Sequence, residues 1–287
     1  MPVTDIVERV CAAYAWQRAL GNHSERDGLC RVVTDRAHRD VWDANHVSEV
    51  RADAPADIER VLRRADDALA HCRHRMFVVD PLTPAAFSAR LALDDYRELD
   101  ATLQLVLAGR LRADPRACAV RPVQTEADWQ SLHALLREDH AEGGRTHGGP
   151  MPEHVTEGMI ASYRSKAPAY QFFLASEDGV DCAYGAGVLC DNRLGMVEDL
   201  FTRPSSRRRG LATAIIARAV AHARDRGADE ILIGAHATDA PKRLYAALGF
   251  APVCLTREYI RHLGSGRGDQ AGLEAAAPSA PGVGRQR

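Results

Sequence analysis

Apolar residues recur every three or four positions in several stretches of the chain, and short apolar runs lie between these stretches. The first pattern predicts amphipathic helices and the second predicts buried strands. Between about residues 119 and 263, helices are predicted at 126–139, 152–164, 211–224 and 240–248. Strands are predicted at 170–176, 182–191, 194–202, 230–235 and 251–259. The segment therefore reads as two helices, three strands and a loop, followed by helix, strand, helix and strand.

The first 115 residues show a weaker version of the second half of this order. Strands are predicted at 41–47, 76–80 and 101–108, and helices at 55–71 and 84–93. Val50 and Phe201 are separated by nearly the same sequence offset as Tyr96 and Phe250. A constant offset favours a duplicated half-module, although four matched elements could also arise by chance in a chain of alternating helices and strands.

The length of 287 residues is enough for about two domains. We expect one domain at 1–115 and a second at 119–263. Residues 264–287 are rich in Gly, Ala, Pro and Ser and carry almost no large apolar side chains, so a disordered tail is predicted there. No uncharged run approaches the roughly 20 residues that a membrane helix requires, so no membrane span is expected.

Composition narrows the possible partners. The formal net charge is −2, so no global field draws the molecule to nucleic acid or to anionic lipid. Among the 37 basic residues only Lys166 and Lys242 are lysines, and the others are arginines. The seven cysteines are scattered and never form a C-x-x-C pair, which favours neither a disulfide scaffold nor a metal site. Together with an N-terminus that lacks secretory-signal features, this predicts a cytoplasmic protein.

The most informative stretch connects the predicted strand 194–202 to the predicted helix 211–224. Gly210 and Ala212 lie where that helix begins, and four arginines precede or enter the turn. Small residues let backbone N–H groups approach a ligand closely, and the N–H groups at a helix start hold phosphate. The arginines would add positive charge around the same anion. Taken alone, the pattern fits a turn with solvated arginines equally well.

In these residues the chain resembles the GCN5-related N-acetyltransferase (GNAT) superfamily. Arg207–Ala212 matches the family's pyrophosphate loop, Gln/Arg-x-x-Gly-x-Gly/Ala. Residues 197–204 resemble its central strand, and Arg243–Phe250 resembles the "LYxxxGF" helix end that closes the acetyl-CoA site. The resemblance spans about residues 119–263. It implies an α+β fold, with a mixed, mostly antiparallel sheet flanked by helices and preceded by a partial, degenerate GNAT-like domain in a tandem arrangement.

The resemblance also implies acetyl-CoA as the cosubstrate and no metal. Exposed backbone groups of the splayed central strand would bind pantetheine, and the backbone amides of residues 208–213 would hold the pyrophosphate. The implied cosubstrate-binding residues are Leu200, Phe201, Thr202, Arg207, Arg208, Arg209, Gly210, Leu211, Ala212, Thr213, Asp239 and Tyr245.

Acyl transfer from a thioester to an amine needs a neutral amine, a stabilised oxyanion and a protonated leaving thiolate. Tyr245 is the candidate general acid, because a phenol can protonate a thiolate; its ring could instead only pack. An N–H near Leu200 is the expected oxyanion donor. Glu198 is the candidate base or amine anchor, with a solvated edge acid as the alternative. Glu198 and Asp199 cannot both face the cleft unless a bulge intervenes, and a similar strand in polyamine acetyltransferases favours Glu198.

Two features depart from the family pattern. An asparagine often lies six residues before the helix tyrosine, and here Asp239 takes that place. Since an aspartate cannot donate, the contact would be altered or taken over by His236 or Thr238. In the N-terminal half, Arg51–Asp57 carries acids where an anion-binding loop would have glycines, so that half is predicted to be non-catalytic.

Other polar clusters give weaker signals. His71, Cys72 and His74 cannot close a tetrahedral metal site by themselves and are expected to be ordinary helix-end residues. A predicted loop begins at Asp139 and follows the first helix of the GNAT-like segment; it is expected either to recognise the acceptor or to be a mobile polar loop. Its polar side chains are His140, Glu142, Arg145 and His147. No cysteine lies in a motif with a histidine base, so no nucleophilic cysteine is predicted.

The sequence therefore predicts an N-acetyltransferase. It would transfer the acetyl group of acetyl-CoA to a primary amine of a small molecule or protein, by direct attack in a ternary complex. Because one half is degenerate, the chain is also similar to mycothiol synthase, which acylates the amine of a thiol metabolite. A non-catalytic acyl-CoA-binding regulatory module is a further alternative. Nucleic-acid binding through 203–209 is disfavoured, since nothing around this stretch is basic. A monomer or homodimer is expected.

Overall fold

The computed structural model describes residues 3–99, 101–113, 118–144, 151–167 and 169–263, so the tail predicted at 264–287 lies outside the described residues. The helices are α1 (Val3–Ala19), α2 (Pro55–Ala68), α3 (Ala85–Leu93), α4 (Glu126–Gly144), α5 (Glu153–Lys166), α6 (Leu211–Asp225) and α7 (Pro241–Leu248), with 3-10 turns η1 (Trp42–Ala44) and η2 (Pro204–Ser206). The strands are β1 (His23–Arg26), β2 (Arg31–Thr34), β3 (His46–Ser48), β4 (His74–Val79), β5 (Arg97–Glu98), β6 (Thr102–Leu107), β7 (Ala119–Pro122), β8 (Tyr170–Glu177), β9 (Val180–Leu189), β10 (Leu194–Thr202), β11 (Glu230–His236) and β12 (Ala251–His262).

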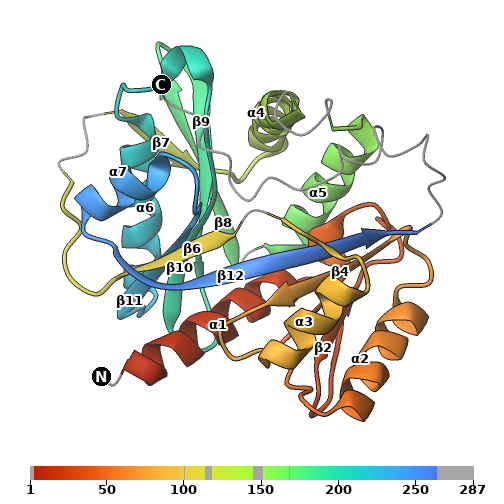
Figure 1. The fold of residues 1–287 in the computed structure, drawn as a ribbon. Helices are drawn as coiled ribbons and strands as arrows, with labels where there is room; N and C mark the ends of the chain where they lie inside the picture. Colours follow the sequence, from red (N-terminus) through yellow and green to blue (C-terminus); the bar gives the residue numbers. More distant parts are fainter. Residues whose placement is uncertain (1–2, 100, 114–117, 145–150, 168, 264–287) are drawn as a thin grey trace.

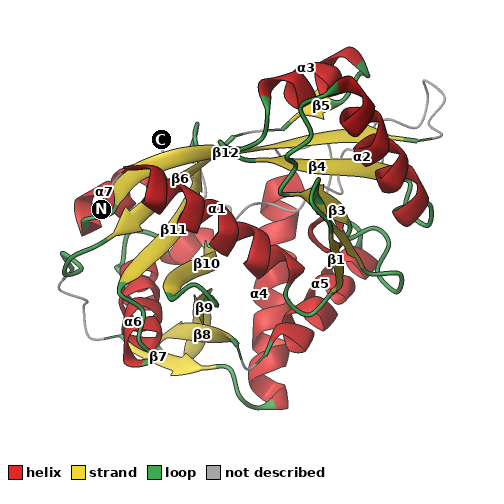
Figure 2. Ribbon diagram, turned by 90° about the horizontal axis from the view of Figure 1, so that it is seen from below, coloured by secondary structure: helices red, strands yellow, loops and turns green. Residues whose placement is uncertain are grey.

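The strands form one twelve-stranded sheet in the order β1-β2-β3-β4-β12-β6-β11-β10-β9-β8-β7, with β5 paired to β12. Among the described residues, β3 with β4 and β10 with β11 are the parallel pairs, and the other neighbours are antiparallel. Helices cover both sides of this sheet (Figures 1 and 2). The predicted α+β fold with a mixed, mostly antiparallel sheet is confirmed.

Both halves of the chain follow the same path around a parallel pair of strands. In the N-terminal half the order is β3, α2, β4, α3 and then β6; in the C-terminal half it is β10, α6, β11, α7 and then β12. In each case a crossover helix connects the two parallel strands. The weak sequence echo between the halves therefore corresponds to a repeated topology.

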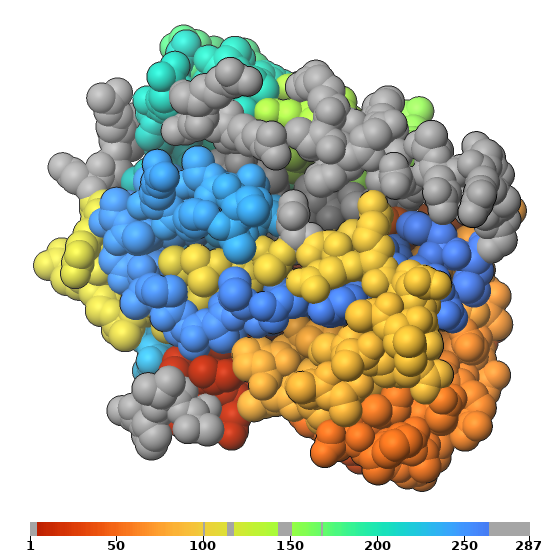
Figure 3. Space-filling view, in the orientation of Figure 1, coloured from red at the N-terminus to blue at the C-terminus, as the bar shows by residue number. Residues whose placement is uncertain are grey.

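The two halves exchange their last strands. β6, the last strand of the N-terminal half, lies between β11 and β12. Residues 251–256 of β12 pair with β6, whereas residues 257–262 pair with β4. Figure 1 shows β12 as a long blue arrow that runs from one half into the other, and in Figure 3 its atoms lie among those of the N-terminal half. The sheet thus continues across the boundary expected near residues 115–119.

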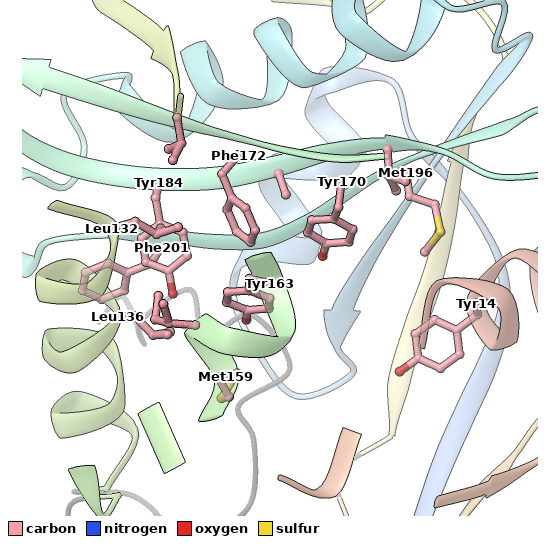
Figure 4. Packing of buried hydrophobic residues seen from close by; sticks show 14 of the residues in the cluster. Tyr14, Leu132, Leu136, Met159, Tyr163, Tyr170, Phe172, Tyr184, Met196 and Phe201 are labelled. Atoms are coloured by element: carbon pink, nitrogen blue, oxygen red, sulfur yellow. The ribbon is translucent and has the colours of Figure 1, made fainter. Parts of the chain in front are cut away.

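Apolar cores lie on both faces of the C-terminal half of the sheet. On one face, α6 and α7 bury Ile215 and Tyr245 against β6, β9, β10 and β11. On the other face, α1, α4 and α5 enclose an aromatic cluster that includes Tyr163, Tyr170 and Tyr184, which Figure 4 shows from close by. A third core lies between α2, α3 and the N-terminal strands.

Some elements differ from the prediction. The first helix of the acetyltransferase-like segment continues to Gly144 rather than ending at 139, because Arg137 and His140 on its last turns bond to Thr156 of α5. The strand predicted at 41–47 is η1 followed by β3. Here the side chain of Asn45 donates to the carbonyls of His38 and Val41 and stabilises a turn.

Candidate active site

β10 and β11 lie side by side only at one end. Their parallel register pairs residues 194–197 with 230–233. Beyond this point β10 continues to Thr202 against β9, and β11 continues to His236 against β6. Within the described residues, the facing edges of the two strands are not paired with each other from Glu198 onward. Backbone N–H and C=O groups at such an opening are available to a bound molecule.

A bulge distorts β10 at this opening. The register with β9 shifts between Glu198 and Phe201, and Asp199 has φ = 52°, a left-handed conformation that non-glycine residues rarely adopt. Gly185 lies opposite the bulge. A Cβ atom there would lie 2.6 Å from Cγ2 of Ile215 and 3.0 Å from Cδ1 of Leu200, so glycine is what lets the bulge and α6 pack together.

The bulge gives two neighbouring carboxylates inward positions. Glu198 is 8% exposed, and its Oε1 atom has no hydrogen-bond partner among the described residues. Burial, and after it the nearby charge of Asp199, raises the pKa of Glu198 to about 8, while Arg18 and Lys166 oppose the shift. Glu198 is therefore a carboxyl group that changes its protonation state near neutral pH.

Asp199 has a different environment. Its carboxylate accepts hydrogen bonds from the hydroxyl of Tyr163 at 2.9 Å and from that of Tyr170 at 2.5 Å. Tyr170 in turn accepts a hydrogen bond from Gln17 of α1 at 3.3 Å. Burial raises the pKa of Asp199, and the two tyrosines oppose this effect. The side chain of Asp199 is thus committed to neighbours within the fold.

The loop after β10 leads into an uncapped helix start. Arg208 has φ = 61°, and Gly210, the N-cap of α6, has φ = 88°. No side chain caps this helix end, so the first N–H groups of α6 have no side-chain partner from the N-cap. Left-handed residues beside a helix N-terminus form a concave set of N–H groups that favours an anion.

Three of the four arginines of this loop form ion pairs with acids of the fold. Arg207 pairs with Glu142 at 2.5 Å and donates to the carbonyl of Thr202 at 3.0 Å. Arg209 pairs with Glu177 at 2.8 Å, and Arg203 pairs with Glu138. Acids of the fold thus engage Arg203, Arg207 and Arg209, whereas Arg208 has no ion-pair partner among the described residues; that these arginines add charge around the anion stays a prediction.

Tyr245 lies on α7, and Asp239 lies in the turn between β11 and this helix. Tyr245 is 1% exposed and belongs to the core cluster that contains Leu200. Burial raises the pKa of Tyr245, and the charges of Glu198 and Asp239 raise it further, so the phenol stays protonated at neutral pH. Asp239 donates its backbone N–H to the carbonyl of His236 at 3.0 Å, in the turn before α7.

Two cations near Glu198 were not predicted. Arg18 of α1 is buried, donates to Tyr14 at 2.6 Å, and pairs with Asp43 and Glu258. The ammonium of Lys166 lies 5.5 Å from the ring centre of Tyr170. Burial lowers the pKa of Lys166.

The other candidate residues have ordinary roles or lie elsewhere. His140 bonds to Thr156 at 2.7 Å, and burial lowers its pKa to about 4. Glu142 lies on α4 and pairs with Arg207, whereas Arg145 and His147 lie outside the described residues. His71 and His74 both bond to Asn45. In the part of the chain that the structure describes, no group of His, Cys, Asp and Glu side chains could hold a metal ion.

The N-terminal half differs at the position that corresponds to the phosphate loop. Its crossover helix α2 has Pro55 in its first turn, which removes a backbone N–H, and Asp57 in the same turn adds negative charge. Arg51, just upstream, pairs with Asp80 at 3.1 Å. This helix start therefore lacks the features that favour an anion at α6. No helix among the described residues is long and apolar enough to cross a membrane.

Comparison with known proteins agrees with this geometry. Residues 129–250 match the family model described as "Acetyltransferase (GNAT) family". This part of the chain is a GNAT acetyltransferase domain. No curated protein gives a significant match to the sequence.

Solved structures extend the likeness to both halves. A GCN5-related N-acetyltransferase from Kribbella flavida has a TM-score of 0.65 at 17% identity, covering 92% of this chain and 98% of its own. A functionally unknown conserved protein from Staphylococcus epidermidis also has a TM-score of 0.65, at 8% identity and with 85% and 95% coverage. A tandem GNAT protein from the clavulanic acid biosynthesis pathway has a TM-score of 0.52 at 11% identity, with 84% and 82% coverage. At these identities the likeness concerns the fold, a tandem arrangement of GNAT-like halves.

Proposed function

We propose that the chain is an N-acetyltransferase that transfers the acetyl group of acetyl-CoA to a primary amine of a small molecule or protein, by direct attack in a ternary complex. The divergence of β10 from β11 carries this proposal. At this opening lie unpaired backbone groups, the carboxyl group of Glu198 with a pKa near 8, and the buried phenol of Tyr245. One loop connects the end of β10 to the uncapped start of α6.

The residues present fit acetyl-CoA. Backbone groups of Leu200, Phe201 and Thr202 lie on the strand edge that β11 leaves unpaired, and a pantetheine chain carries amides that can bond to such an edge. The N–H groups at the start of α6, from Leu211 to Thr213, suit a pyrophosphate. Asp239 can accept a hydrogen bond there but cannot donate one.

Three groups of this chain would serve acyl transfer. Glu198 would accept a proton from the attacking amine, directly or through water, since its carboxylate forms near pH 8. The N–H of Leu200 would donate to the oxyanion that develops on the thioester carbonyl. Tyr245 would give a proton to the departing thiolate, a role that requires the protonated phenol that burial maintains.

Thiol release from acetyl-CoA, measured against polyamines, amino acids, aminoglycosides, lysine peptides and a cysteinyl thiol metabolite, tests the proposal. At least one amine should release thiol and gain an acetyl group. Tyr245→Phe should lower kcat about 10- to 1,000-fold and leave CoA affinity unchanged. Tyr96→Phe, at a buried tyrosine of the other half, is the matched control and should keep the wild-type rate. An unchanged rate in Tyr245→Phe would remove this residue from the mechanism.

A non-catalytic acyl-CoA-binding module is the second candidate, and the aspartate at position 239 supports it. Tight CoA binding without thiol release on any acceptor would favour this alternative. Acetylation of the cysteinyl compound alone would favour a mycothiol-synthase-like activity. For both the N-acetyltransferase and the mycothiol-synthase-like activity, the N-terminal half is proposed to be non-catalytic. The free cysteines support a cytoplasmic location. The protein is proposed to be a monomer or a homodimer.

A further inference from the structure

The N-terminal half contains a cavity of about 550 Å³ that the acetyltransferase site does not use. It lies between the hairpin of β1 and β2 and the helix α2, on the part of the chain coloured red to orange in Figure 1. This volume is in the range of pockets that bind small molecules.

The local sequence explains why polar side chains line this cavity. Ile58, Val61, Leu62 and Ala65 of α2 turn into the N-terminal core. Arg60, Arg63 and Arg64 follow the helical spacing of three and four along a neighbouring face and line the cavity. On the opposite wall His23 is paired with Thr34 across the β1–β2 register, and both side chains line the same cavity.

Positive charge exceeds negative charge in this lining. Arg36, Arg60, Arg63 and Arg64 line the cavity, against two acids, Glu25 and Asp67. Arg60 and Arg64 are engaged by acids, Arg60 by Asp57 and Arg64 by Asp27 and Glu25.

Two of the arginines remain free for a ligand. Arg36 and Arg63 form no ion pair with any described residue, and both are exposed. Guanidinium groups present paired N–H donors that match phosphate oxygens. Two free guanidinium groups at one cavity therefore favour a ligand that carries phosphate.

The position of the cavity separates it from the proposed acetyl-CoA site. Because α2 corresponds to α6 in the repeated topology, a CoA-like phosphate in this half would lie at the start of α2. There Pro55 lacks a backbone N–H and Asp57 adds negative charge, so both disfavour a phosphate. The cavity instead follows α2 from Arg60 to Ala68. A second cavity of about 410 Å³ shares His23, Thr34 and Arg36 with it and reaches Ser162 and Ser165 of α5, in the acetyltransferase half.

We propose that this cavity binds a phosphorylated small molecule, with Arg36 and Arg63 as its principal phosphate contacts. Arg60, Arg64 and His23 surround the same space, and Val32 and Ala68 supply apolar contact to the remainder of the ligand. The N-terminal half thus has a ligand site of its own, with chemistry different from that of the start of α6.

Isothermal titration of the full chain with tripolyphosphate tests the proposal, in saturating CoA so that the start of α6 is filled. One saturable site is expected, and its affinity should fall as salt rises. The double variant Arg36→Glu/Arg63→Glu should weaken this binding at least about tenfold. Arg39→Glu/Arg193→Glu is the matched control, because it makes the same charge change at exposed arginines outside the cavity, and it should stay within about twofold.

Several results would overturn the site. The first is the absence of saturable heat at about millimolar tripolyphosphate. The second is an equal loss of affinity in the control variant Arg39→Glu/Arg193→Glu. The third is citrate binding as tightly as tripolyphosphate, because the site would then recognise charge alone. If the glutamate variant melts earlier than the wild type, Arg36→Gln/Arg63→Gln replaces it and should still lose binding. Without the probe, acetyl transfer by these variants should equal that of the wild type.

Discussion

Glu198 and Asp199 are adjacent carboxylates whose surroundings separate their chemistry. Asp199 accepts hydrogen bonds from two tyrosines, whereas Oε1 of Glu198 lacks a partner among the described residues. A group that is buried and unbonded prefers to be neutral, and a buried group with hydroxyl donors is better able to stay ionised. The pair thus combines a carboxyl group that two hydroxyl groups hold in place with one that can take up and release a proton.

The pH dependence of acetyl transfer follows from this difference. Glu198 acts as a base only when ionised, and its pKa is raised to about 8, so kcat/KM should rise with pH through about 8 and level off above it. Glu198→Gln should lower kcat/KM about 100- to 10,000-fold and abolish this rise of kcat/KM with pH. Asp199→Asn is the comparison variant, and its kcat/KM should still rise with pH. If Glu198→Gln kept both the wild-type kcat/KM and its rise with pH, Glu198 would be excluded as the base.

A substitution at Gly210 tests whether the start of α6 binds the pyrophosphate of CoA. With φ = 88°, a β-branched side chain at this residue would be strained, and it would add bulk beside the uncapped N–H groups of α6. Gly210→Val should weaken CoA binding at least about 100-fold, measured by titration. Gly179→Val, at another left-handed glycine with open space around it, is the control for strain alone and should retain CoA affinity.

The candidate residues differ in how far a local motif marks them in the sequence. Glu198, Gly210 and Tyr245 lie in short strings whose spacing reflects one strand, one turn or one helix end. Arg18 depends on contacts with segments far along the chain, so no local pattern marks it. Lys166 is one of two lysines in a chain rich in arginine, but a rare residue type does not by itself indicate a role.

At the scale of elements, the bulge in β10 depends on α1 and α5, which lie on the same face of the sheet, and on the neighbouring strand β8. Tyr163 of α5 and Tyr170 of β8 hold the side chain of Asp199, and Gln17 of α1 holds Tyr170. The bulge determines where Glu198 and the N–H of Leu200 lie. Support from these neighbours therefore positions the reacting groups without contacting a substrate.

Tyr170→Phe should disturb this support. It removes a hydrogen bond to a carboxylate, which costs about 1.5–3 kcal/mol, measured by chemical denaturation. We expect kcat to fall about tenfold because the bulge relaxes, with CoA affinity unchanged. Tyr96→Phe provides the control, because the hydroxyl of Tyr96 bonds to no carboxylate among the residues that the structure describes. Loss of stability without any change in kcat would show that the tyrosine supports the fold and not the bulge.

The sequence predicted most elements of the C-terminal half to within a few residues, and fewer of the N-terminal half. Residues 10–19 of α1 are almost all buried, since this helix packs against β10, β12 and η1. A helix that is covered on most sides has no one-sided apolar stripe, so its periodicity is weak. β1 and β2 have four residues each, too few for an alternating pattern to be distinguished.

At the scale of the whole molecule, the strand exchange makes the halves inseparable. Removing the N-terminal half would take β6 out from between β11 and β12, and removing the C-terminal half would leave β4 without β12. The choice of strand partner is a long-range property that periodicity does not contain. The sequence therefore predicted two halves but could not predict their exchange.

A cut between the halves tests this arrangement. With a protease site introduced at residue 115, the cleaved fragments should co-elute in gel filtration and unfold in a single transition, because backbone ladders on both sides of β12 connect them. Each fragment expressed alone should aggregate through its unpaired strand edges. Separation of the fragments in native buffer would contradict the exchange.

The position of β12 also constrains how the protein is made. β6 ends at Leu107 and its partner β12 ends at His262, so a ribosome working at about 5–20 residues per second needs roughly 8–30 s to synthesise the interval. Throughout that time β4 and β6 leave the exit tunnel without the strand that belongs between them. The nascent N-terminal half is thus an incomplete sheet, a natural client for a chaperone, until the last strand is released.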